Sequence, residues 1–168
     1  YSHYDFLGAV ENFFSKCAPA MFMGWSNLNF DRRMFHFNFF KGNRYPYATH
    51  SSPNSEHDGL HIARAAQTLN SETLKTELTE AGNPSLALES LSRMQGFDTS
   101  ASHTAYVDAQ NSLKVLRIIK DKHKENWETF LKTSTKTSVE TFLKNEGIYS
   151  IFENVKGRNM MYLTSTLH

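Results

Sequence analysis

The histidines of this chain are the residues whose type and spacing are best suited to chemistry. His50, His57 and His61 fall within twelve residues, and His103 lies farther along, five residues before Asp108. An imidazole exchanges protons near neutral pH, so histidine is a frequent general acid or base in enzymes. We therefore predict His61 and His103 as a proton-transfer pair, with His57 in support and Asp108 orienting an imidazole.

Basic and aromatic side chains near these histidines predict an anionic substrate. Arg44 and Arg64 are the predicted anion clamp, because a guanidinium offers several N–H donors to phosphate oxygens. Tyr47 and Trp25 belong to the aromatic part of the chain and are predicted to bind substrate beside them. The sequence thus favours a small soluble enzyme, a hydrolase or lyase, that acts on a phosphate-bearing or nucleotide-like substrate.

The same histidines suggest a metal site as a further alternative. In a helix, His57 and His61 would lie one turn apart, the spacing that helical metal sites use, and His50 would add a third ligand. Gly59 interrupts that helix, and Asp58 stands where the His-Glu-x-x-His zinc motif has its glutamate. We predict no cofactor, and a divalent metal on the three histidines remains the alternative.

A non-catalytic protein-interaction domain, of an effector or accessory type, is the alternative from another class. In it an aromatic hairpin would contact a protein partner, and the histidines would have no chemical role. The strand face that carries His36 and Asn38 separates the two hypotheses. An enzyme pocket needs this polar face turned inward, whereas an interaction domain can leave it in solvent.

Charge and composition restrict the partners. Eighteen basic and seventeen acidic residues among 168 leave a net charge of +1, too small for a field that attracts nucleic acid or an anionic membrane. We therefore predict a small phosphorylated ligand or a protein partner, and no strong nucleic-acid binding. The single cysteine, Cys17, favours a reducing compartment, either a cytoplasm or delivery into one. No apolar run is long enough for membrane insertion.

One segment nevertheless combines basic and aromatic residues. Arg32, Arg33 and Lys41 accompany Tyr45 and Tyr47. Proteins that bind single-stranded RNA stack bases on strand-borne aromatic rings in such surroundings. The near-neutral total charge and the missing RNP signature argue against this interpretation, and alternating phenylalanines are more typical of a core.

The predicted fold is α+β, with one globular domain over residues 1–168. Phe35, Phe37 and Phe39 alternate with polar residues, which predicts a strand and an aromatic-rich hairpin within a small antiparallel sheet. Apolar residues at three- and four-residue spacings, with Gly, Pro and Asn at the ends, predict four to five helices packed on that sheet. The predicted helices cover residues 3–16, 60–81, 84–95, 110–132 and 137–145, the strands 20–30, 34–41, 103–108 and 158–166, and a long loop 42–59.

Overall fold

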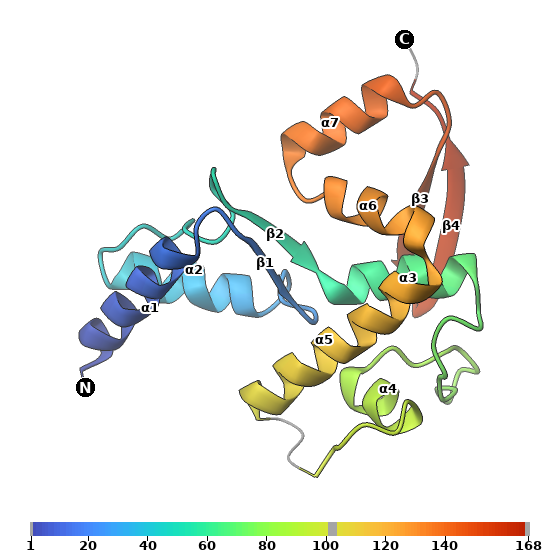
Figure 1. Cartoon of the computed structure of the whole chain (residues 1–168), viewed down its shortest axis with the longest axis horizontal. Helices are drawn as coiled ribbons and strands as arrows, with labels where there is room; N and C mark the ends of the chain where they lie inside the picture. The colour runs from blue at the N-terminus through green and yellow to red at the C-terminus, as the bar shows by residue number, and fades with distance from the viewer. Residues whose placement is uncertain (1, 101–103, 167–168) are drawn as a thin grey trace. The chain divides into compact units, whose positions relative to one another are not determined.

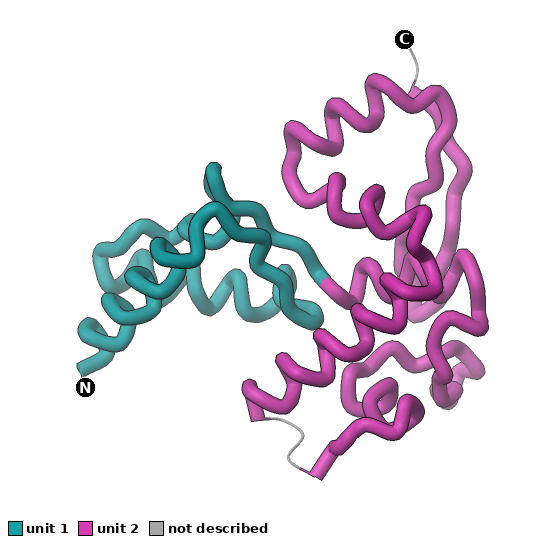
Figure 2. Tube along the Cα trace, in the orientation of Figure 1, with its two compact units in different colours: residues 1–58 teal, residues 59–168 magenta. Residues whose placement is uncertain are grey.

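The protein has the mixed α+β architecture predicted from its sequence (Figure 1). The computed structural model describes residues 2–100 and 104–166. The chain consists of two compact units: unit 1, residues 1–58, and unit 2, residues 59–168 (Figure 2). This division leaves the single domain over residues 1–168 as a prediction. No helix among the described residues is long and apolar enough to cross a membrane.

Unit 1 combines two helices with two short parallel strands. Helix α1, His3–Cys17, begins at Ser2, whose hydroxyl accepts a hydrogen bond from the backbone N–H of Asp5 in a capping box. Strand β1, Met21–Gly24, pairs with β2, Ser55–Asp58, so that Gly24 lies opposite Asp58. Helix α2, Asp31–Lys41, lies between the strands in sequence. The order β1–α2–β2 is the helical crossover that parallel strands require.

Helix α2 replaces the second strand of the predicted hairpin, so the prediction of an aromatic-rich hairpin is wrong. Phe35 and Phe39 are four residues apart and pack on one side, against Leu7 and Phe14 of α1. Phe37 points away and is 62% exposed. The aromatic residues of this segment fit a strand as well as a helix, and their contact with α1 favours the helix. The face shared by His36 and Asn38 in the predicted strand therefore does not form.

Unit 2 is mainly helical. Its helices are α3 Gly59–Leu69, α4 Leu88–Met94, α5 Ala105–Lys122, α6 Lys124–Lys132 and α7 Lys136–Asn145. Its fully buried apolar side chains include Ile62 of α3, Leu91 of α4 and Ile119 of α5. The helix predicted over 60–81 ends at Leu69, and the one predicted over 110–132 breaks at His123. The strand predicted over 103–108 is wrong from residue 105 onward, because α5 begins there.

The antiparallel hairpin of the protein lies in unit 2. Strands β3, Tyr149–Val155, and β4, Arg158–Thr164, pair through their whole length, and α3 contacts both. The turn between them uses Lys156 and Gly157 with φ values of 50° and 84°. Glycine adopts this left-handed conformation without steric cost. The prediction of a strand over 158–166 is confirmed for β4, whereas β3 was not predicted.

Candidate functional site

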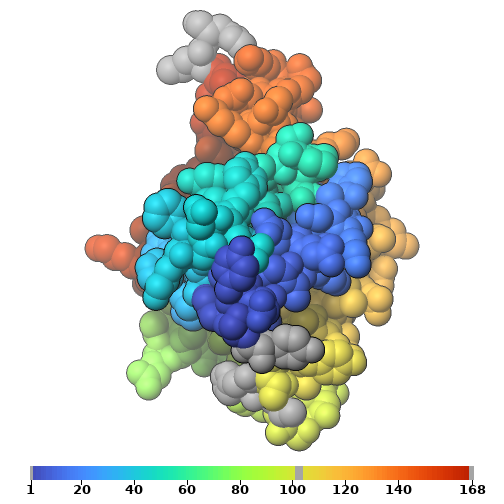
Figure 3. All heavy atoms as spheres, turned by 90° about the vertical axis from the view of Figure 1, so that its left-hand side faces the viewer, coloured from blue at the N-terminus to red at the C-terminus, as the bar shows by residue number. Residues whose placement is uncertain are grey.

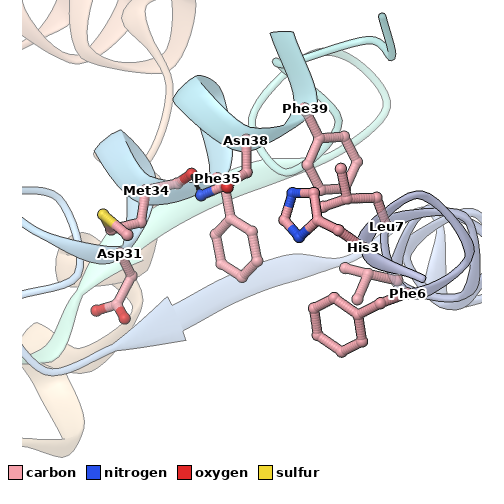
Figure 4. Close-up of a pocket in the computed structure, with 9 residues that line it drawn as sticks. His3, Phe6, Leu7, Asp31, Met34, Phe35, Asn38 and Phe39 are labelled. Carbon is pink, nitrogen blue, oxygen red and sulfur yellow. Dashed lines mark hydrogen bonds between the residues drawn. The ribbon is translucent and has the colours of Figure 1, made fainter. Parts of the chain in front are cut away.

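A pocket of about 170 Å³ lies between α1 and α2 in unit 1. Figure 4 shows Asp31 and Met34 at one end of the row of lining side chains and Phe6, Leu7 and Phe39 at the other, with the His3 ring between. The lining is largely apolar, with three polar side chains. It consists of His3, Phe6, Leu7, Val10, Asp31, Met34, Phe35, Asn38 and Phe39. An apolar recess with a few polar groups is the usual form of a ligand pocket.

The turn between β1 and α2 positions Asp31. The buried carboxylate of Asp58 accepts hydrogen bonds from the backbone N–H groups of Ser26, at 2.8 Å, and Leu28, at 3.3 Å. The backbone oxygen of Asn27 then accepts the N–H of Arg32, 2.9 Å away. Asp31 is the first residue of α2 and is exposed. The turn therefore presents a carboxylate just beyond the carboxyl end of β1, where open α/β sheets generally bind ligands.

Glu56 anchors a group of charged side chains in unit 1. Its carboxylate is only 5% exposed and accepts a hydrogen bond from Arg32 Nε at 2.5 Å, while His50 Nδ1 lies 3.8 Å from the same oxygen. Burial, followed by the charge of Arg32, lowers the pKa of His50, and Glu56 opposes the shift. His36 also lowers it. The neutral imidazole of His50 is therefore favoured in this environment.

Four rings of unit 1 form what we call the aromatic–imidazole cluster: Tyr45, Tyr47, His36 and His50. Tyr47 makes edge-to-face contacts with the other three, at centroid distances of 5.2 Å to His36, 5.6 Å to His50 and 5.6 Å to Tyr45. His36 and His50 lie 5.0 Å apart. Both tyrosines are about half exposed, at 54% for Tyr45 and 47% for Tyr47. These contacts fix the rings while leaving part of each tyrosine open to solvent.

Basic residues accumulate around this cluster in the sequence. The segment 32–55 contains Arg32, Arg33, Lys41 and Arg44 and no acidic residue. Arg33 and Lys41 are exposed. Arg44 is 14% exposed, pairs with Glu11 and lies over the ring of Tyr4. Because Arg32 and Arg44 are paired with Glu56 and Glu11, Arg33 and Lys41 supply the exposed positive charge of this segment.

The predicted catalytic residues lie on several different elements. His57 is on β2, whereas His61 is an exposed residue of α3, so the two do not share a helix face. Asp108 is in the first turn of α5. His103 lies outside the described residues, so its meeting with His61 stays a prediction.

The predicted substrate and metal ligands are likewise distributed. Trp25 follows β1 and Arg64 is on α3, both half-buried, while Arg44 is held by Glu11 and Tyr47 belongs to the cluster. Over residues 2–100 and 104–166, no three His, Cys, Asp or Glu side chains are grouped as metal ligands. His50, His57 and His61, the predicted metal ligands, therefore do not form such a group.

Sequence reasoning missed Asp31 and Asp58. The predicted strands 20–30 and 34–41 left Asp31 in the short gap between them. Asn27 and Asp31 were nevertheless a signal, because Asn and Asp favour turns and acidic residues favour the first turn of a helix. The buried role of Asp58 had no such signal, since it depends on the pairing of β2 with β1.

Known proteins with similar sequences are nucleases. No family model matches the chain. It is 26% identical over 119 residues to exodeoxyribonuclease I of Haemophilus influenzae, and 26% identical over 175 residues to that of Buchnera aphidicola. The alignments cover 70% and 99% of this chain but only 25% and 36% of those proteins. The chain thus spans well under half the length of these relatives.

Solved structures of E. coli exonuclease I share the fold. A complex with a dA16 oligonucleotide has a TM-score of 0.77 and 21% identity, over 84% of this chain and 30% of that one. A complex with a 5cy-dT13 oligonucleotide has a TM-score of 0.78 and 18% identity, over 99% and 36%. A zinc-bound form of the complex with single-stranded DNA has a TM-score of 0.75 and 20% identity, over 84% and 30%.

These similarities correct the functional predictions. The relatives degrade DNA, so histidine acid–base catalysis on a small phosphate-bearing substrate is the wrong function, as are the non-catalytic interaction domain and the histidine-based metal-binding protein. The prediction against strong nucleic-acid binding is wrong as well, because the structural neighbours hold oligonucleotides. That prediction gave the near-neutral net charge of the whole chain more weight than the basic and aromatic residues of the segment 32–55. The chain has the fold of a part of exonuclease I.

Proposed function

We propose that this chain is part of an exodeoxyribonuclease I-like enzyme and that unit 1 contacts a single strand of DNA. The observation that carries the proposal is the sequence similarity to two exodeoxyribonucleases I, which extends over 99% of the chain in one of them. The shared fold with oligonucleotide complexes of E. coli exonuclease I supports it.

The basic segment 32–55 supplies the contacts to the DNA backbone. Arg33 and Lys41 are exposed on α2, and the segment holds no acidic residue that would repel phosphates. Cationic side chains bind single strands chiefly by releasing counterions, so the affinity falls as salt is added. Arg44 acts indirectly, because its guanidinium is occupied by Glu11 and Tyr4.

Asp31 is our candidate for the cleavage site in unit 1. Each of the other acidic side chains of unit 1 has a structural role. Asp5 caps α1, Glu11 and Glu56 are in ion pairs, and Asp58 holds the turn. Nucleases commonly hydrolyse phosphodiester bonds with divalent metal ions held by carboxylates. Because the described residues do not group three such ligands, we assign no step to a metal. The role predicted for Asp108, orienting an imidazole, stays a prediction and is not extended to DNA cleavage.

Fluorescence anisotropy of a labelled dT13 oligonucleotide tests the binding step. We expect the chain to bind the single strand more tightly than a duplex of equal length, with an affinity that falls steeply between low and high salt. Arg33→Gln with Lys41→Gln should weaken binding and flatten the salt dependence. Lys120→Gln with Lys124→Gln, an equal loss of exposed charge in unit 2, is the control. Equal affinity for single strand and duplex, or no salt dependence, would contradict the proposal.

Release of nucleotides from the same labelled strand in the presence of Mg²⁺ tests the cleavage step. We expect Asp31→Asn to retain DNA binding, which the basic side chains supply, and to lose most of the cleavage activity, because the carboxylate would supply an oxygen ligand to the divalent ion that nucleases commonly use. Asp121→Asn, an exposed carboxylate at the end of α5, is the matched control. Asp31→Asn protein with unchanged cleavage would remove Asp31 from the site.

A further inference from the structure

The tyrosines of the aromatic–imidazole cluster are fixed but not buried. Tyr47 contacts His36, His50 and Tyr45 at interplanar angles of 76° to 86°. The hydroxyl of Tyr45 lies 2.8 Å from that of Ser51, within hydrogen-bonding distance. A side chain held in one rotamer loses little entropy when a ligand binds it. The cluster is therefore preorganised for contact with a flat partner.

This arrangement differs from the aromatic core of unit 1. Phe39 and Phe14 in that core are at most 8% exposed, whereas Tyr45 and Tyr47 are 54% and 47% exposed. The segment that carries the tyrosines follows α2, and its cyan atoms are uncovered on the face shown in Figure 3. Burial inside unit 1 thus accounts for Phe14 and Phe39 but not for the exposed surface of Tyr45 and Tyr47.

We propose that Tyr45 and Tyr47 form a base-stacking site, on which bases of a single DNA strand lie against the exposed tyrosine surface. The occupant follows from the surrounding charge. The segment 32–55 that carries both rings has no acidic residue, and its Arg33 and Lys41 are exposed, whereas Arg32 and Arg44 are paired with Glu56 and Glu11. Aromatic side chains beside a basic groove bind single strands of any sequence, because every base has a π-face. The proposal rests on the proposed DNA binding and adds that the bases, not only the phosphates, are held.

The two imidazoles act as supports of this site. His36 Nε2 and His50 Nδ1 are buried and have no hydrogen-bond partner among the described residues. Their rings pack against Tyr47 and keep its plane in position. Tyr47 is thus the inner ring, braced from several sides, and Tyr45 is the outer ring, which contacts Tyr47 and Ser51.

The test compares an ordinary labelled single strand with an abasic strand of the same length and charge. We expect the native chain to bind the ordinary strand more tightly. Tyr47→Ala and Tyr45→Ala should each weaken binding of the ordinary strand by about tenfold, the loss typical of one stacked base, and leave binding of the abasic strand unchanged. Tyr47→Phe and Tyr45→Phe should retain the native affinity, because they keep the ring.

Two further measurements keep this test decisive. Tyr162→Ala, a tyrosine of β4 that is 44% exposed, is the matched control and should bind both strands normally. A 2-aminopurine base placed in the strand should lose fluorescence on binding the native chain and recover it with Tyr45→Ala, the variant that removes the outer ring. Circular dichroism verifies that each variant is folded.

The outcomes separate stacking from DNA binding itself. Native chain that binds ordinary and abasic strands equally well overturns the stacking site and leaves the proposed function intact. Alanine variants that weaken both strands to the same degree also overturn it, because the rings then act only through the fold. Failure to bind either strand, as expected if the tyrosines meet a protein instead, overturns the stacking site and the proposed function together.

Discussion

The Nε2 atom of His123 lies 2.6 Å from the Oγ1 atom of Thr73 in the interior of unit 2. His123 stands between α5 and α6, and Thr73 belongs to the segment after α3. The neighbouring Lys122 donates hydrogen bonds to the backbone oxygens of Glu72 and Thr73, at 2.7 and 2.9 Å. Two consecutive residues therefore tie the α5–α6 break, where the helix predicted over 110–132 is interrupted, to the segment that follows α3.

The first prediction concerns pH and the stability of unit 2. Burial, and secondarily the charge of Lys122, lowers the pKa of His123 in the folded protein. An unfolded histidine titrates near 6.5, so below that pH the unfolded chain takes up the proton first. The contribution of His123 is therefore present above about pH 6.5 and is lost as the pH falls through the folded-state pKa. Urea unfolding between pH 7.5 and 5 should show this loss.

A glutamine at this position provides the comparison. His123→Gln removes the titration and should flatten the decrease in stability on acidification, although it lowers stability at pH 7.5 by disturbing the bond to Thr73. His61→Gln changes an exposed histidine of α3 and should retain the native pH dependence. An unchanged pH slope in His123→Gln would show that this imidazole does not carry the effect.

The second prediction separates the helix from the predicted strand over residues 34–41. Phe39 is 2% exposed in the core of unit 1, and Phe37 is 62% exposed. Phe39→Ala should cost about 4 kcal/mol of unfolding free energy, and Phe37→Ala less than about 0.5 kcal/mol. In the predicted hairpin both rings shared one face, so similar losses for the two variants would favour the strand.

The sequence carried local information better than long-range information. The helix over 3–16 was predictable because Leu7, Val10 and Phe14 repeat at helical spacing, and the structure places α1 there. The segment 34–41 was not, because its aromatic residues satisfy both periods and only contact with α1 decides between them. The site depends on such contacts even more. Asp31 is positioned by Asp58, twenty-seven residues away in the chain, through hydrogen bonds that no local pattern reveals.

The third prediction concerns the buried ion pair of unit 1. Glu56 is 5% exposed and Arg32 is 31% exposed, and their side chains are joined at 2.5 Å. Arg32→Met leaves the Glu56 carboxylate in a buried place without this donor, which should cost about 2 kcal/mol. The double variant Arg32→Met with Glu56→Gln should regain part of that loss, because no unpaired charge remains. Additive losses in this double-mutant cycle would show that the two side chains are not coupled.

The fourth prediction tests whether Asp58 builds the turn that presents Asp31. Its carboxylate is fully buried and accepts the N–H groups of Ser26 and Leu28 through separate oxygens. Asp58→Asn replaces one acceptor oxygen by an NH₂ group, which faces a backbone donor and cannot accept its hydrogen bond. We expect a loss of about 2 kcal/mol in unfolding free energy.

Hydrogen exchange gives this last prediction its local readout. The backbone amides of Ser26 and Leu28 should exchange faster in Asp58→Asn, while those in the middle of α5 keep their native protection because unit 2 is unaltered. Under the proposed function, the variant should also cleave DNA less well than the native chain, since a loosened turn no longer fixes the position of Asp31. Unchanged protection at Ser26 and Leu28 would contradict the role of Asp58, whatever happens to activity. Faster exchange with unchanged cleavage would retain that role and show that cleavage does not depend on this turn.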